Sequence, residues 1–134
     1  VVVVMLFEGR LEKYRFTVAR VRAGLRGGKP EEAARAAAKV YLGRLLEADF
    51  EAVAVKVEGQ PVRLTRREFE LLRYLVQNRN RVLTRDRLLE RVWGYDRLVE
   101  TRSVDVHVGR LRGKLGPVGR QIETVVGLGY RFVE

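Results

Sequence analysis

The 134-residue sequence contains no cysteine and a single histidine, His107. Without cysteine the chain forms no disulfide bond and offers no thiolate to zinc, and one histidine cannot form a metal site built from several histidines. The apolar run VVVVMLF at residues 1–7 is too short to span a bilayer, and no basic segment precedes it as in a signal peptide. We therefore expect a cytoplasmic protein with no bound metal.

Sequence motifs of common enzyme classes are also lacking. Neither GxxxxGK[ST] nor a Rossmann fingerprint occurs, and Gly127-Leu128-Gly129 fits a hairpin turn better than a phosphate loop. The order of residues suggests no Ser/His/acid set either. We expect no enzyme, no catalytic residue and no cofactor.

Acidic residues are outnumbered by basic ones, with 17 Asp and Glu against 27 Lys and Arg, which gives a net charge of +10. The excess is spread along the chain, because residues 1–39 carry 9 basic and 4 acidic side chains and residues 40–134 carry 18 and 13. This balance favours a polyanionic partner, above all nucleic acid. The alternative is a basic surface that is simply solvated.

The middle of the chain predicts a strand followed by a helix. The alternation in VAVKVEG places Val53, Val55 and Val57 on one face of a strand. The stretch TRRE fits a capping box, with Thr65 as N-cap and Glu68 at the third helical position.

Two further helices and a hairpin are predicted downstream. Thr84 opens the second helix and Gly94 ends it, and Thr101 is expected to cap the third helix. The stretch QIETVVGLGYRFVE predicts two strands joined at Val126–Leu128. This order favours an α+β winged helix-turn-helix. The expected core comprises Leu64, Phe69, Leu72, Leu75, Leu88, Leu89, Val92, Trp93, Val104, Val108, Leu111, Leu115, Val125, Tyr130 and Phe132.

The predicted third helix, residues 101–115, has two contrasting faces. Two glycines in a helix interior cost about 1 kcal/mol each in stability relative to alanine. We expect that, in exchange for this cost, they permit close approach of the helix to a nucleic-acid groove. There Arg110 is placed to chelate guanine, and Val106 to touch a thymine methyl. An ordinary surface helix with a solvated face is the alternative. The apolar stripe is Val104, Val108, Leu111 and Leu115, and the opposite face is Arg102, Val106, Gly109, Arg110 and Gly113.

Three stretches resemble the C-terminal domain of OmpR/PhoB-type response regulators. They are LTRREFELLRYLVQNRNRVLTRDRLLERVWG, VWGYDRLVETRSVDVHVGRLRGKLG and IETVVGLGYRFV. The resemblance covers about residues 42–134. It implies an α+β winged helix with an N-terminal antiparallel sheet of four strands, three helices and a C-terminal β-hairpin wing. The third helix is then expected in the major groove of duplex DNA, and the wing, residues 121–133, at the minor groove or backbone.

The resemblance also implies roles for individual residues. Two positions depart from the family pattern, because Gly109 and Val126 stand where members often carry basic residues. The loop Gly94–Glu100, with Tyr95, Asp96, Arg97 and Glu100, is expected to contact RNA polymerase. Arg102, Ser103 and Arg112 match phosphate-contacting positions, Val106, His107 and Arg110 match groove-facing ones, Thr124 matches the base of the wing, and Lys114 and Arg131 complete the expected DNA-binding set.

Members of this family normally begin with a receiver domain that carries a phospho-accepting aspartate. The first aspartate here is Asp49, so we expect no phospho-acceptor and a receiver that is largely missing. Residues 1–39 are predicted to be a strand and helix segment with a linker, similar to the end of a receiver, and residues 40–134 the DNA-binding domain. Dimers on tandem sites are a further expectation.

The alternative function is a degenerate interaction module that contacts RNA polymerase or another protein.

Overall fold

Residues 39–94 and 99–134 are described by the computed structural model, and the chain divides into two units, residues 1–59 and 60–134. The segment predicted for residues 1–39 lies outside the described residues except for Lys39. The predicted boundary after residue 39 therefore stays a prediction. None of the described helices is long and apolar enough to cross a membrane.

The first sheet contains four short strands in the order β1-β2-β3-β4. Val55 and Val57 are buried, as the alternation predicts. The prediction for Val53 is wrong, because this residue lies in the turn before β3 (Ala54–Val57), at φ 55°, and is 64% exposed. Asp49 causes this turn, because its carboxylate accepts from the backbone N–H groups of Glu51 and Ala52. The strands are β1 (Val40–Leu42), β2 (Leu46–Asp49), β3 (Ala54–Val57) and β4 (Gln60–Pro61).

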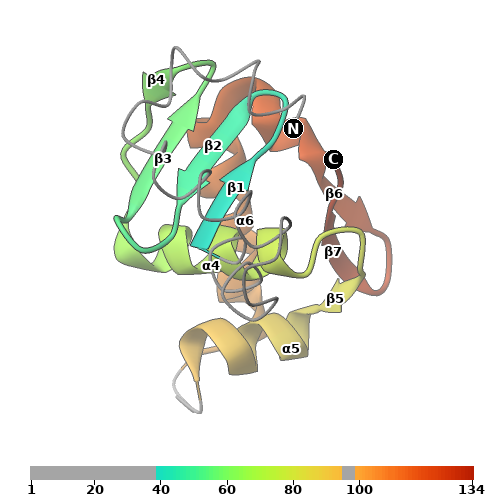
Figure 1. Cartoon of the computed structure of the whole chain (residues 1–134). Coiled ribbons are helices and arrows are strands. Elements are labelled where there is room, and N and C mark those ends of the chain that lie inside the picture. The colour runs from blue at the N-terminus through green and yellow to red at the C-terminus, as the bar shows by residue number, and fades with distance from the viewer. Residues whose placement is uncertain (1–38, 95–98) are drawn as a thin grey trace, which may run out of the picture. The chain divides into compact units, whose positions relative to one another are not determined.

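The second unit contains the helices (Figure 1). Thr65 and Thr84 cap as predicted, since their hydroxyls accept from backbone N–H groups three residues further on. The predicted cap at Thr101 is wrong. Glu100 has the extended backbone of an N-cap, and Thr101 is the first helical residue. The elements are α4 (Arg66–Gln77), α5 (Arg85–Leu88) with the π-helical turn η2 (Leu89–Trp93), α6 (Thr101–Leu115) and the 3-10 helix η3 (Gly116–Gln121).

A three-stranded sheet completes the second unit. Its hairpin, β6 (Ile122–Val125) and β7 (Gly129–Phe132), confirms the prediction. The third strand, β5 (Leu83–Thr84), pairs with β7 and gives the order β5-β7-β6. Sequence reasoning missed β5 because two residues carry no periodicity.

The core of the second unit forms where α4, α5, α6 and the three-stranded sheet pack together (Figure 1). The predicted α6 stripe is confirmed, because all four of its side chains are 0% exposed. Trp93 is only half-buried, because it lies at the end of η2 with its ring against His107 and Arg67. The predicted core residues that are only half-buried are Leu64, Leu89, Trp93 and Val125, and those missed include Leu71, Leu83, Val118 and Ile122.

Candidate nucleic-acid interface

Helix α6 presents an exposed face opposite its buried stripe. We call Arg102, Val106, Gly109, Arg110 and Gly113 the outer face, and all five are exposed, as the helical spacing predicts. Arg102 and Arg110 make no hydrogen bond or ion pair with other residues in the described ranges, 39–94 and 99–134. Their guanidinium groups are therefore available to an external anion or base edge.

Arg112 behaves differently, because it binds the hairpin. Its Nε and Nη2 donate to the carbonyl oxygen of Ile122 at 3.0 and 2.6 Å, and Nη2 also donates to Thr124 Oγ1 at 2.8 Å. The same guanidinium lies over the Tyr130 ring, 5.4 Å from its centroid. Arg112 therefore fixes the direction of the β6–β7 hairpin relative to α6.

A second link joins α6 to the hairpin through Asp105. Arg85 Nε donates to Asp105 Oδ1 at 2.7 Å, and the Tyr130 hydroxyl donates to the same oxygen. The hydrogen bonds from Tyr130 and Arg85 hold the pKa of Asp105 below its usual value, while burial and the Asp105 charge raise the pKa of Tyr130. At neutral pH an ionised carboxylate therefore holds α5, α6 and β7 together. Sequence reasoning missed this cluster, since its residues are far apart in the chain.

Lys114 binds a buried carboxylate at the other end of α6. Its Nζ lies 2.7 Å from Glu68 Oε1, and Glu68 is 2% exposed. Burial raises the pKa of Glu68, but the hydrogen bonds from Lys114 and Thr65 outweigh that effect and leave the pKa below its usual value. Lys114 therefore compensates a buried charge that also caps α4.

The remaining predicted contact residues lie on two flanks of this surface. His107 Nδ1 is 2.8 Å from the Ser103 carbonyl oxygen, and its ring meets Trp93 edge-on at 5.0 Å. Arg131 pairs with Glu123 across the hairpin at 2.8 Å. The structure thus brings the predicted residues onto α6 and the hairpin, while their contacts to DNA stay predictions.

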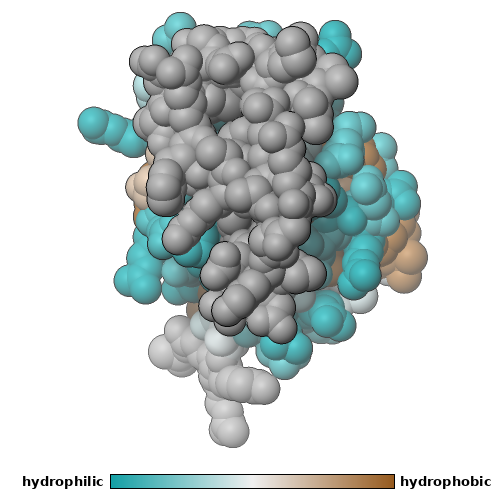
Figure 2. Space-filling model, in the orientation of Figure 1, coloured by the Kyte–Doolittle hydropathy of each residue, from teal (hydrophilic) through white to brown (hydrophobic). Residues whose placement is uncertain are grey.

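The tip of the hairpin is apolar. Val126 is 91% exposed and Leu128 is 56% exposed, with Gly127 at φ 77° between them. Figure 2 shows hydrophobic atoms over the edge of the molecule at which the β6–β7 hairpin lies. The tip therefore offers van der Waals contact and no charge.

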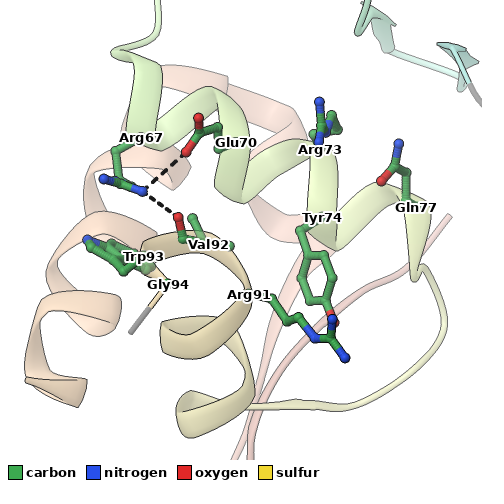
Figure 3. A pocket seen from close by; sticks show the side chains of 9 residues that line it. All are labelled: Arg67, Glu70, Arg73, Tyr74, Gln77, Arg91, Val92, Trp93 and Gly94. Atoms are coloured by element: carbon green, nitrogen blue, oxygen red, sulfur yellow. Dashed lines mark hydrogen bonds and ion pairs between the residues drawn. The ribbon is translucent and has the colours of Figure 1, made fainter. Parts of the chain in front are cut away.

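A pocket of about 410 Å³ lies between α4 and η2 (Figure 3). Arg67 forms part of its wall, because it donates to Glu70 and to the Val92 carbonyl oxygen and lies over the Trp93 ring. Arg73 and Arg91 also line it and make no ion pair within the described part of the chain. The pocket thus combines unpaired guanidinium groups with an aromatic wall.

The predicted polymerase loop follows directly after this pocket. Tyr95, Asp96 and Arg97 lie outside the described residues. Glu100 is exposed, and its carbonyl oxygen accepts from the backbone N–H of Ser103 at 2.9 Å. The structure therefore describes only the two ends of that loop, Gly94 and residues 99–100.

A family model and curated protein sequences both match this chain. Residues 59–132 match the family model described as "Transcriptional regulatory protein, C terminal". The chain is 43% identical over 120 residues to the sensory transduction protein RegX3 of Mycolicibacterium smegmatis, which covers 86% of this chain and 52% of that protein. The chain thus spans about half the length of this curated relative.

Solved structures show the same similarity. The response regulator DrrB of Thermotoga maritima, an OmpR/PhoB homolog, superposes with a TM-score of 0.67 at 30% identity, over 89% of this chain and 52% of that one. The DNA-binding domain of Klebsiella pneumoniae RstA, solved in complex with the RstA box, gives 0.62 at 33% identity, over 71% of this chain and 97% of that one.

Proposed function

Because the chain belongs to the OmpR/PhoB-type family of C-terminal domains of transcriptional regulatory proteins, we propose that it regulates transcription by binding duplex DNA. In this proposal α6 enters the major groove, and the β6–β7 hairpin lies at the adjacent minor groove or backbone. We also propose a cytoplasmic location, since a regulator must share a compartment with its DNA.

The observation that carries this proposal is the pair of unengaged arginines on the outer face of α6. Arg110 is placed to donate two hydrogen bonds to the O6 and N7 acceptors of a guanine, and Val106 to contact a thymine methyl. Arg102, about one turn before Val106 and two turns before Arg110, is placed to bind a phosphate. The rigid link from Arg112 to the hairpin supports simultaneous contact by both elements.

The engaged residues retain donors for DNA. A guanidinium group has five N–H donors, so Arg112 and Arg131 are able to bind phosphate while they hold Ile122 and Glu123. Ser103 and Lys114 on α6 and Thr124 at the base of the hairpin are proposed to lie against the DNA backbone, and His107 is proposed to face the groove. The apolar tip at Val126 predicts weak minor-groove reading, because such reading usually relies on arginine.

Fluorescence anisotropy of the full chain on duplex DNA tests this function. A duplex is first selected from a random-sequence pool, and both pool and selected duplex are then titrated from low to physiological salt. We expect binding that falls steeply with salt, because neutralised phosphates release counterions, together with tighter binding to the selected duplex. Feeble, salt-independent binding would favour an interaction module instead.

We further propose that a protein partner, RNA polymerase, contacts the pocket between α4 and η2 and the loop that follows it. The few side chains that carry most of the binding energy of a protein interface are most often Trp, Tyr and Arg, and this pocket is lined by Arg73, Arg91, Tyr74 and Trp93. Charge reversal at Arg73 and Arg91 should reduce binding to purified polymerase without changing DNA affinity. Equal polymerase binding by the variant would exclude this surface.

Dimeric binding to tandem sites is also proposed from the family. It predicts two chains per selected duplex when the sites are paired. Sedimentation of the complex measures the ratio directly, and a single chain on every selected duplex would contradict it.

A further inference from the structure

Tyr130 is buried where α6 meets the three-stranded sheet. It lies on β7, the central strand of that sheet, and is 4% exposed. Two cations lie over its ring, because the guanidinium carbons of Arg85 and Arg112 are each 5.4 Å from the ring centroid. Its hydroxyl donates to Asp105 Oδ1. One side chain of the hairpin therefore contacts two residues of α6, Asp105 through its hydroxyl and Arg112 through its ring.

The hairpin is attached to α6 at two points along the helix. Asp105 holds β7 through the Tyr130 hydroxyl. Arg112 holds β6, because it donates to the Ile122 carbonyl oxygen and to Thr124 Oγ1. Asp105 and Arg112 are seven residues apart, which corresponds to about 10 Å along the helix axis. A single attachment would leave the hairpin free to pivot, whereas two attachments at this separation, one to each strand, fix its direction as well as its position.

The only acidic residue of α6 is Asp105. Its side chain is 42% exposed and lies on the flank beside the outer face. A duplex carries one negative charge per about 1.7 Å of its length, so an ionised carboxylate on this helix opposes binding. Arg85 compensates part of that charge through a hydrogen bond of 2.7 Å. Any gain that Asp105 brings to DNA binding therefore has to come from its contacts, because its charge acts in the opposite direction.

We propose that Asp105 and Tyr130 are positioning residues for DNA binding, which hold the hairpin at the angle to α6 that lets both elements contact one duplex. This inference rests on the proposed DNA-binding function. Neither residue has to touch DNA, because each acts through the hairpin. A surface that is ordered before binding loses less conformational entropy when it binds. The two residues should therefore favour a selected duplex, which needs helix and hairpin contacts together, over random sequence, where phosphate contacts dominate.

The test compares the full-length wild type with Asp105→Asn and Tyr130→Phe, each titrated by anisotropy against the selected duplex and the random pool. Asp105→Asn should weaken binding to the selected duplex about tenfold, although it removes a negative charge. Its binding to the pool should be unchanged or tighter, because attraction to phosphates increases. Tyr130→Phe keeps the ring and loses the hydroxyl, so it should weaken binding to the selected duplex about threefold to tenfold, the scale of one hydrogen bond.

Asp86→Asn is a matched control for the change of charge. Asp86 is exposed on α5, directly after Arg85, and its side chain forms no hydrogen bond or ion pair with another residue in the described ranges, 39–94 and 99–134. The same loss of charge at this position should leave binding to the selected duplex and the pool unchanged or slightly tighter.

Nuclear magnetic resonance measures the position of the hairpin directly. Without DNA, ¹⁵N relaxation at the Gly127 backbone N–H should report greater motion of the hairpin tip in Asp105→Asn and Tyr130→Phe than in wild type, and no change in Asp86→Asn. The same spectra show whether each variant is folded. If Asp105→Asn does not fold, Tyr130→Phe decides the question by the same criteria.

Three outcomes would overturn the inference while DNA binding stands. The first is binding of Asp105→Asn to the selected duplex that is as tight as in wild type or tighter. The second is an equal loss on the selected duplex and the pool, which indicates a general loss of stability. The third is unchanged relaxation at the hairpin tip in both variants. If wild type itself shows no salt-dependent duplex binding, the proposed function and this inference fail together.

Discussion

The two flanks of α6 and its outer face carry similar basic residues that are held in different ways. On one flank Arg112 binds the hairpin backbone, and on the opposite flank Lys114 binds the buried Glu68. On the outer face, Arg102 and Arg110 make no such contact within residues 39–94 and 99–134. Both sets lie on one helix of 15 residues.

A basic residue on an exposed helix is therefore not by itself evidence for a DNA contact. Arg112 and Lys114 already serve the orientation and stability of the domain through direct contacts, whereas Arg102 and Arg110 make no hydrogen bond or ion pair within residues 39–94 and 99–134, and Arg102 acts on the fold only through its charge near Asp105. Substitution on the flank should therefore change folding, and substitution on the outer face should change binding.

The largest effect is expected from the buried stripe that supports both regions. Leu111→Ala should lower the free energy of unfolding by about 2–5 kcal/mol, because it empties a fully buried site. Val106→Ala, on the outer face and 45% exposed, should change it by less than about 0.5 kcal/mol. Chemical denaturation measures both, and similar losses for the two would show that the faces are assigned wrongly.

On the outer face, Arg110→Ala should weaken binding to the selected duplex by about 1–3 kcal/mol and relax specificity at one base pair. Its melting temperature should stay close to that of wild type. Anisotropy on duplexes altered one base pair at a time provides the readout. An equal loss on every sequence would reassign Arg110 to a phosphate.

On the flank, Lys114→Met should lower the free energy of unfolding by about 1–2 kcal/mol. Removing one partner of a buried ion pair leaves an uncompensated charge, and partial exposure of Lys114 reduces the usual penalty. Glu68→Gln combined with Lys114→Met should recover part of the loss in a double-mutant cycle. Additive losses would contradict a direct pairing.

The smallest effect is expected from acidification. The pKa values of Glu68 and Asp105 are lower in the folded chain than their ordinary values. Their contribution to stability is therefore complete above the unfolded pKa values, near pH 4, and declines as the pH falls through the folded ones. Denaturant midpoints measured from about pH 6 to pH 3 should fall less for Asp105→Asn than for wild type. Parallel curves would exclude a role for this carboxylate.

Much of the second unit was predictable from local pattern. Thr65 and Thr84 cap their helices, and the helical spacing separated the α6 stripe from the outer face, because these signals act within a few residues. Local pattern failed at Val53, where the Asp49 carboxylate organises a turn, and at Thr101, where the preceding residue has the capping conformation. It also failed at Trp93, whose hydrophobicity does not reveal its half-exposed place at a helix end.

From the sequence it was possible to predict three helices followed by a hairpin, the buried stripe of α6 and the two glycines on its outer face. Helical periodicity, and the caps at Thr65 and Thr84, encode these features through contacts between near neighbours in the chain. Tertiary structure alone decided that Arg112 and Lys114 are engaged and that Asp105 joins Arg85 to Tyr130. It also decided that Gly109 and Gly113 face open space. Such features depend on residues that are far apart in the sequence and come into contact only when the domain packs, so the spacing of residues along the chain does not predict them.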